Sequence, residues 1–166
     1  MEFSEKEKQV YDVLNDLGIP YDRHGHPPVY TVEEAEKQWT DIIGAHCKNL
    51  FLRNKKGNRH YLVILEASKA ADLKTLNKLL GEDRLSFASE KRLMKYLSLE
   101  TGAVSVFGLI NDRENHVIVV IDDDLKKTEA VNFHPNVNTA TVGISFPDFE
   151  KFLSWSGNRV RYLPFK

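Results

Sequence analysis

The sequence predicts an α+β protein whose helices flank a mixed or largely antiparallel central sheet. Two strand-like segments joined by a polar, Gly-containing turn within residues 47–65 read as a β-hairpin. Amphipathic helical segments precede and follow this hairpin in the sequence, and the predicted strands and helices do not alternate strictly. The 166 residues, 42% of them hydrophobic, can bury a core, and no repeat, linker or low-complexity tract divides them. We therefore expect a single domain over residues 1–166.

The charge balance limits how this chain can bind nucleic acid. It has 23 Lys and Arg against 24 Asp and Glu, so any contact with nucleic acid must come from a local basic patch. One cysteine excludes an internal disulfide and a multi-cysteine metal site. No signal-like apolar segment follows Met1 and there is no ~20-residue apolar span, which predicts a cytoplasmic protein without membrane contact.

An amphipathic helix is expected near the N-terminus. Residues 4–7 have the spacing of a capping box, and Gly18 is placed as a C-cap. The apolar residues between them that share one helical face are Val10, Leu14 and Leu17.

A proline-containing loop over residues 24–28 leads to a second helix start. Thr31–Glu34 repeats the capping box and begins a short helix toward Trp39. Backbone N–H groups at such a helix start can meet an anion. His24 and His26 do not by themselves indicate a metal site, because no third ligand lies nearby in the sequence.

The predicted hairpin contains an unusual lysine. Alternation places Lys48 on the same side of its strand as Leu50 and Leu52, and opposite Asn49. A half-buried sheet would turn that side inward. Lys48 therefore either reaches water at a sheet edge with its stem packed, or has a functional partner.

Helices and a glycine-bounded segment follow the hairpin. Asp72–Gly81 reads as a capped amphipathic helix, and a further helix runs from Ser89 to Leu97. Gly102–Gly108 is expected to form a strand with a glycine at each end. Such a glycine pair marks a turn, tight packing, or close approach of the backbone to a ligand.

The last third of the chain is predicted to complete the sheet. His116–Ile121 is an apolar strand, and Asp122–Asp124 is expected to be a solvated turn rather than a metal cluster. Ala130–Pro135 passes from strand to loop, and Asn136–Val142 returns as a strand. Phe146–Leu153 is an amphipathic helix with a proline in its first turn.

Several of these segments, taken together, resemble a known family. The stretches, in chain order, are His26-Pro27-Pro28 with Thr31–Ala35, Cys47–Leu52, Leu85–Ala88, Gly102–Gly108, and Phe133–Asn136 with Asn138–Thr141. They resemble the prolyl-tRNA-synthetase-associated editing domains, which are free-standing aminoacyl-tRNA deacylases of the YbaK/ProX kind. The Lys-Asn-Leu-Phe-Leu and Phe-His-Pro elements are most similar to the branch that removes alanine from mischarged tRNA for proline.

The resemblance implies a YbaK-like α+β editing fold with a pocket for the aminoacylated 3′ end of tRNA. It also implies ester hydrolysis without a metal or organic cofactor, with Lys48 as the catalytic residue and prolyl-tRNA synthetase as a further partner. Many relatives have proline where this chain has Val106, so the geometry of that loop is expected to differ. The substrate-binding residues expected on this basis are Asn49, Tyr30, His26, Gly102, Ser105, Gly108, Phe133 and His134.

The residue chemistry agrees with hydrolysis of an activated ester. An aminoacyl ester needs a positioned water and donors for the oxyanion more than a strong nucleophile. The chain has no G-x-S-x-G elbow, and alternation turns Cys47 away from Lys48. Lys48 can serve as a fixed cation for the terminal phosphate or the ester carbonyl. His134 is either an acid–base group or a pocket wall and hydrogen-bond donor; we favour the second, because the resemblance implies assistance by the 2′-hydroxyl of the substrate.

A size-excluding pocket would explain selection of a small amino acid. Walls made by Phe133, His134 and Tyr30 would admit a methyl side chain and refuse a pyrrolidine ring, and exclusion by clash discriminates more strongly than a missing methylene. Two alternatives stay open. The chain could deacylate another mischarged pair, with cysteine or serine on tRNA, or it could be a non-catalytic module that binds tRNA or a small ligand or docks on a synthetase.

The hairpin that carries Lys48 also carries a cluster of basic residues. This cluster could follow the phosphates of the tRNA acceptor stem, or it could be a solvated hairpin tip. The residues predicted to bind tRNA are Arg53, Lys55, Lys56 and Arg59.

Overall fold

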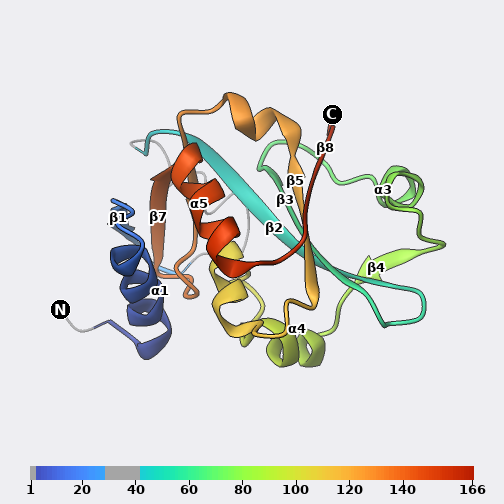
Figure 1. Cartoon of the computed structure of the whole chain (residues 1–166), viewed down its shortest axis with the longest axis horizontal. Coiled ribbons are helices and arrows are strands. Elements are labelled where there is room, and N and C mark those ends of the chain that lie inside the picture. Colours follow the sequence, from blue (N-terminus) through green and yellow to red (C-terminus); the bar gives the residue numbers. More distant parts are fainter. Residues whose placement is uncertain (1–2, 29–41) are drawn as a thin grey trace.

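The structure, a computed structural model, describes residues 3–28 and 42–166, and it confirms the α+β class (Figure 1). Within these residues the strands form one mixed sheet in the order β1-β7-β6-β2-β3-β5-β8, with β4 paired to β2 outside this path. The strands are β1 (Asp22–Gly25), β2 (Ala45–Asn54), β3 (His60–Glu66), β4 (Leu85–Phe87), β5 (Val117–Asp122), β6 (Ala130–Phe133), β7 (Ala140–Ser145) and β8 (Val160–Leu163).

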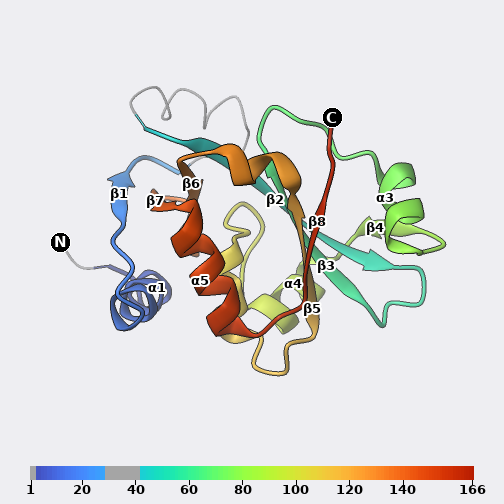
Figure 2. The same cartoon turned by 45° about the horizontal axis from the view of Figure 1, so that its top comes forward.

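Helices cover both faces of this sheet. Figures 1 and 2 show α5 and α3 on opposite sides of the part formed by β3, β5 and β8, and α1 beside β1 at the far end. Short 3-10 helices connect further elements. The helices are α1 (Glu5–Asp16), α3 (Leu73–Leu80), α4 (Glu90–Leu97), α5 (Phe146–Ser156), η1 (Val106–Asn111) and η2 (Asp123–Lys127).

Strand β2 joins the two halves of the sheet. Its first residues, Ala45 and His46, pair in parallel with β6, and residues 47–53 pair antiparallel with β3 on the opposite edge. On the edge that carries β6, pairing resumes only at residues 52–54, with β4. Residues 47–50 thus have no partner on that edge among the described strands. This gap in the sheet coincides with Lys48 and Asn49.

The two faces of β2 contribute to different hydrophobic clusters. Cys47 and Phe51 pack in the main core, which also contains Phe149 and Phe152 of α5. Leu50 and Leu52 belong to a second cluster, which also contains Leu76 of α3. Because side chains alternate along a strand, Lys48 projects on the face of the second cluster, together with Leu50 and Leu52 as the sequence predicted.

Several local predictions are confirmed. Ser4 caps α1 by accepting the backbone N–H of Glu7, and Gly18 lies just beyond that helix with a left-handed φ of +70°. Asp72 caps α3 and Gly81 ends it, and Pro147 lies in the first turn of α5. The hairpin, the helix after Ser89 and the strand before Asp122 also form.

The strand predicted over Gly102–Gly108 is wrong. This segment is a turn followed by η1, because Ser105 Oγ accepts the N–H of Phe107 and caps the 3-10 helix. The two glycines are explained by a left-handed backbone conformation at Gly102 and by close packing at Gly108. Gly102 has φ +94°, and a Cβ on Gly108 would lie 2.7 Å from Leu99 Cδ1. The strand expected from Asn136 begins only at Ala140.

The aspartate run is a helix cap rather than a fully solvated turn. Asp122 is completely buried, caps η2, and forms an ion pair with Lys69 at 2.9 Å. Lys69 Nζ also reaches Asp124 and the carbonyl of Phe165. This network attaches the end of the chain to the sheet. The described residues contain no group of three His, Cys, Asp or Glu that could hold a metal ion.

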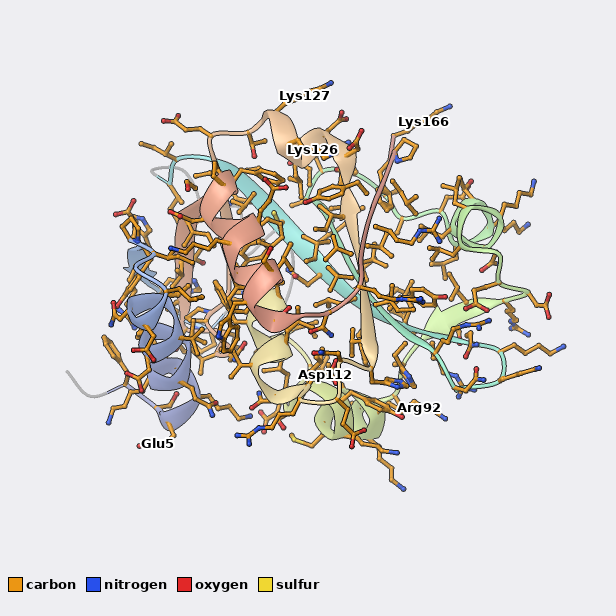
Figure 3. All side chains as sticks on the ribbon, in the orientation of Figure 1. Glu5, Arg92, Asp112, Lys126, Lys127 and Lys166 are labelled. Atoms are coloured by element: carbon orange, nitrogen blue, oxygen red, sulfur yellow. The ribbon has the colours of Figure 1, made fainter. Side chains whose placement is uncertain are left out.

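Strands β1, β4 and β8 were not predicted, and β1 includes His24 and Gly25, which were expected in a loop. β8 is held beside β5 by Asn158, whose Nδ2 donates to Asp112 Oδ2 and to the carbonyl of Val117, both at 2.8 Å; Figure 3 labels Asp112. The helix predicted from Thr31 lies outside the described residues. Among the helices that are described, none has the length and hydrophobicity to cross a membrane.

Candidate active site

The register between β2 and β6 relates Lys48 to His134. Ala45 lies opposite Val131 and His46 opposite Asn132 in a parallel pair, so Lys48 and His134 occupy corresponding positions just beyond the point where the two strands stop pairing. Figure 1 shows β2 as the long strand at the centre of the fold. A cation and an imidazole are therefore expected beside one another at the gap in the sheet.

Lys48 is half-buried and carries no interaction that ties it to the fold. Its neighbour across the hairpin is Leu65, and within the described part of the chain its ammonium has neither an ion pair nor a hydrogen bond. A lysine on an otherwise apolar face without a carboxylate partner is available for an anion or a polarised carbonyl.

His134 has a defined tautomer. Its Nδ1 lies 3.0 Å from the carbonyl oxygen of Ala140, which can only accept, so Nδ1 carries the proton and donates. Burial lowers the pKa of His134, which keeps the ring neutral at neutral pH. Nε2 therefore presents a lone pair. His134 was predicted to donate a hydrogen bond to the substrate, but its N–H already donates to the Ala140 carbonyl. Toward a substrate, this tautomer of His134 can only accept a hydrogen bond.

His26 lies against His134, with 6.1 Å between the ring centroids. Its Nδ1 donates to the carbonyl of Pro27 and its Nε2 accepts from Thr141 Oγ1, both at 2.9 Å. Its backbone N–H donates to the carbonyl of Thr139. Thr141 therefore fixes the ring of His26 beside His134. The sequence contained Thr141 within the Asn-Thr-Ala-Thr stretch, but a threonine in a strand carries no signal of this contact.

Asn49 faces away from Lys48. It shares the core face with Cys47 and Phe51, and its Oδ1 is buried without a hydrogen-bond partner among the described residues. Because the strand edge beside it is open, Asn49 adjoins the same gap from the opposite face. The side chains of Lys48 and Asn49 thus do not form one wall.

The η1 segment borders the loop that follows His134. Asn136, with a left-handed φ of +62°, donates from Nδ2 to the carbonyl of Phe107 at 3.3 Å. Ser105 is fully buried and used as a cap, and Gly108 is required for packing against Leu99. Neither presents a side-chain group for a substrate, so their contribution is to the shape of the backbone near the site.

Phe133 occupies the core rather than an open pocket wall. It is 2% exposed, and its ring lies 5.8 Å from that of Phe107 and 5.1 Å from that of Phe149. Phe133 was therefore wrongly predicted as a wall, whereas His134, also predicted as a wall residue, is partly exposed. Tyr30, the third predicted wall residue, lies outside the described residues.

Cys47 is unsuited to nucleophilic catalysis. Its side chain packs against the main core, and burial raises the pKa of its thiol well above the usual range. It also projects opposite to Lys48.

Of the four residues predicted to bind tRNA, two are held by contacts within the fold and two are exposed. Arg59 forms a two-pronged ion pair with Glu82, at 2.8 and 3.0 Å, and Arg53 donates to backbone carbonyls of its own turn. Lys55 and Lys56 are exposed at the hairpin tip. Seven residues of strand separate Lys55 from Lys48, a distance of about 23 Å. The tip therefore lies well outside the site at the gap.

Comparisons with known proteins agree with this fold. The family model described as aminoacyl-tRNA editing domain matches residues 26–152. A prolyl-tRNA editing protein, ProX, from Acetoanaerobium sticklandii is 47% identical over 150 residues, covering 90% of this chain and 92% of the relative. The mouse prolyl-tRNA synthetase associated domain-containing protein 1 is 33% identical, covering 98% of each chain.

A solved structure supports the fold independently of close sequence similarity. It is the crystal structure of a candidate trans-editing enzyme for prolyl tRNA synthetase, with a TM-score of 0.75, 19% identity, and coverage of 99% of each chain. The family model and the sequence relatives thus identify an editing-type hydrolase. The chain belongs to the aminoacyl-tRNA editing domain family. It is an aminoacyl-tRNA deacylase that acts on mischarged tRNA.

Proposed function

We propose that the chain acts as one editing domain over residues 1–166 and hydrolyses alanyl-tRNA for proline. The observation that carries this proposal is the placement of Lys48 and His134 at adjacent positions where β2 and β6 separate. The names of the two relatives described above support tRNA for proline as the tRNA.

The proposed reaction uses the activation already present in the ester. Water adds to the ester carbonyl, the bond from that carbon to the ribose 3′-oxygen breaks, and the 3′-oxygen receives a proton to give free alanine and tRNA. Lys48 stabilises the negative charge that develops on the carbonyl oxygen, or holds the terminal phosphate. His134 Nε2 accepts a hydrogen bond from the 2′-hydroxyl of the terminal ribose, which orients that hydroxyl toward the attacking water.

The geometry at His134 also suits size selection. Its ring is held by the Ala140 carbonyl on one side and lies against His26, which Thr141 fixes in turn. A wall that cannot move excludes a larger side chain by clash, whereas adding or removing one methylene in a yielding pocket is worth only ~1–3 kcal/mol. Alanine would enter and proline would be refused.

The proposed partner is the acceptor end of the aminoacylated tRNA, with Lys55 and Lys56 at the hairpin tip contacting phosphates of the stem. Association with prolyl-tRNA synthetase is a second proposed contact, and hydrolysis in its absence would show that the synthetase is not required.

A deacylation panel tests the proposal and separates the alternatives. We expect rapid release of alanine from alanyl-tRNA for proline, and prolyl-tRNA spared, when both are incubated with the purified chain. Faster release of cysteine or serine from their mischarged tRNAs would favour the other editing reaction. Binding of tRNA without hydrolysis of any ester would favour a non-catalytic module, and equal rates on the alanyl and prolyl forms would remove the size-exclusion argument.

A further inference from the structure

A recess lies on the face of the sheet opposite α5. It has a volume of about 470 Å³, and strands β3, β5 and β8 form its floor beside the C-terminal end of α3. Tyr61 and Ile118 lie on the floor, and Leu80 and Gly81 form the helix side. We call this recess the arginine groove, because it is bordered by Arg59, Arg159 and Arg161.

Strand alternation explains why the three arginines meet over one face. Leu163 of β8 packs with Tyr61 of β3 in the second hydrophobic cluster, so Arg161, two residues before Leu163, projects on that same face. Arg159 lies two residues before Arg161, and Arg59 lies two residues before Tyr61. Both are therefore expected on this face as well. Two strand spacings, about 10 Å, separate β3 from β8. Long guanidinium side chains on both flanks can therefore reach a common ligand.

The positive charge of the groove is only partly compensated. Arg59 is paired with Glu82, and Arg161 donates to the carbonyl of Leu79 at the end of α3, a position where a cation offsets the helix dipole. Arg159 is exposed and its side chain has no partner among the described residues. Glu82 also accepts a hydrogen bond from the hydroxyl of Tyr61, so one carboxylate borders the groove and offsets the charge of Arg59.

We propose that the arginine groove binds backbone phosphates of the tRNA substrate, an inference that rests on the proposed function. Guanidinium groups bind phosphate oxygens through paired N–H donors, and arginines spaced along a groove suit a ligand with repeated phosphates. Arg59 lies at the base of the same hairpin whose tip carries Lys55 and Lys56, so the groove continues the basic surface away from the tip. The groove adds a phosphate-binding surface that the sequence alone did not indicate, since Arg159 and Arg161 are remote from the hairpin in sequence.

Salt-dependent binding of uncharged tRNA provides the first test. Arg159→Gln removes one charge without breaking an internal contact. Loss of one phosphate contact makes the slope of log affinity against log salt shallower by about 0.9, which corresponds to about eightfold weaker binding at ~0.1 M salt. The matched control is Lys127→Gln, which removes a charge from a side chain that is 82% exposed on η2, at the top of Figure 3. The control should retain the wild-type affinity and slope.

Hydrolysis of two substrates provides the second test. The variant Arg159→Gln should show a higher KM for aminoacylated tRNA but an unchanged rate on alanyl-adenosine, an ester that lacks the phosphates. Wild-type affinity and salt slope in both Arg159→Gln and Arg161→Gln, with unchanged melting temperatures, would overturn the inference. An equal loss on alanyl-adenosine would also overturn it, because the groove would then act through the fold. If the wild type hydrolyses neither ester, the proposed function fails, while the binding experiment still decides the role of the groove.

Discussion

Replacing Lys48 by alanine should abolish deacylation and leave the fold intact. The side chain is half-buried on β2 and has no ion pair or hydrogen bond in the described part of the chain, so its removal leaves no buried charge unpaired. A partly exposed substitution of this kind usually changes the free energy of unfolding by no more than about 0.5 kcal/mol. The catalytic loss is expected to be much larger. Removal of one preorganised donor to a developing oxyanion costs roughly 10²–10³ in rate, or about 2.7–4 kcal/mol.

The position of Lys48 also predicts an incomplete rescue by arginine. Lys48→Arg keeps the charge, but the planar guanidinium is broader than an ammonium and would displace the ester from the neighbouring His134. Single-turnover hydrolysis of alanyl-tRNA for proline measures the chemical step, with circular dichroism and thermal melting as the check on folding. Lys55→Ala, on the same hairpin but about 23 Å away, is the matched control. Near-wild-type turnover of Lys48→Ala would mean that Lys48 is only an edge residue whose stem packs on the sheet, and the catalytic assignment would be refuted.

Three further predictions follow from the same contacts. Cys47→Ser should stay active and hydrolysis should survive EDTA, because the thiol is buried with a raised pKa and faces away from Lys48; a loss with EDTA that zinc restores would contradict this. The double variant Lys55→Gln/Lys56→Gln should bind tRNA more weakly with a salt slope shallower by up to about 1.8, and unchanged binding would make the tip ordinary surface. Burial and neighbouring cations lower the pKa of His60 from 6.5 to about 4, so the unfolded chain binds the proton more readily; melting temperature should fall as pH drops from about 6.5 toward 4, and less so in His60→Gln.

The position of His60 explains why this last effect should be visible in the whole fold. Its ring is fully buried between the hairpin and α4, with Nε2 accepting from Arg92 at 3.0 Å and Nδ1 facing His116 Nε2 at 2.9 Å. Because Arg92 can only donate, His60 carries its proton on Nδ1 and donates to His116. Protonation of His60 would place a second positive charge directly beside that of Arg92 and remove the acceptor that Arg92 uses. A flat melting temperature across this pH range would contradict that arrangement.

Local structure was predictable from the sequence because its causes lie within a few residues. The caps at Ser4 and Asp72, the glycine after α3 and the hairpin with its polar turn all depend on short-range hydrogen bonds and side-chain periodicity. The same alternation correctly separated Lys48 from Asn49 and Cys47. The strand expected over Gly102–Gly108 was wrong because a serine cap and close packing replaced strand pairing there.

Only the tertiary structure decided which distant residues share a site. The parallel pairing of β2 with β6 gives Lys48 and His134 corresponding positions just beyond the paired residues, and the tautomer of His134 depends on a carbonyl six residues away that is positioned by β7. Packing placed Phe133 in the core although it was expected to face a pocket, and the arrival of β8 beside β5 created the arginine groove. The sequence by itself determined most of the helices and strands and the chemistry of their side chains. Which of these side chains lie in one site was decided only by the folded sheet, because strand register and the choice of buried face depend on contacts between segments far apart in the chain.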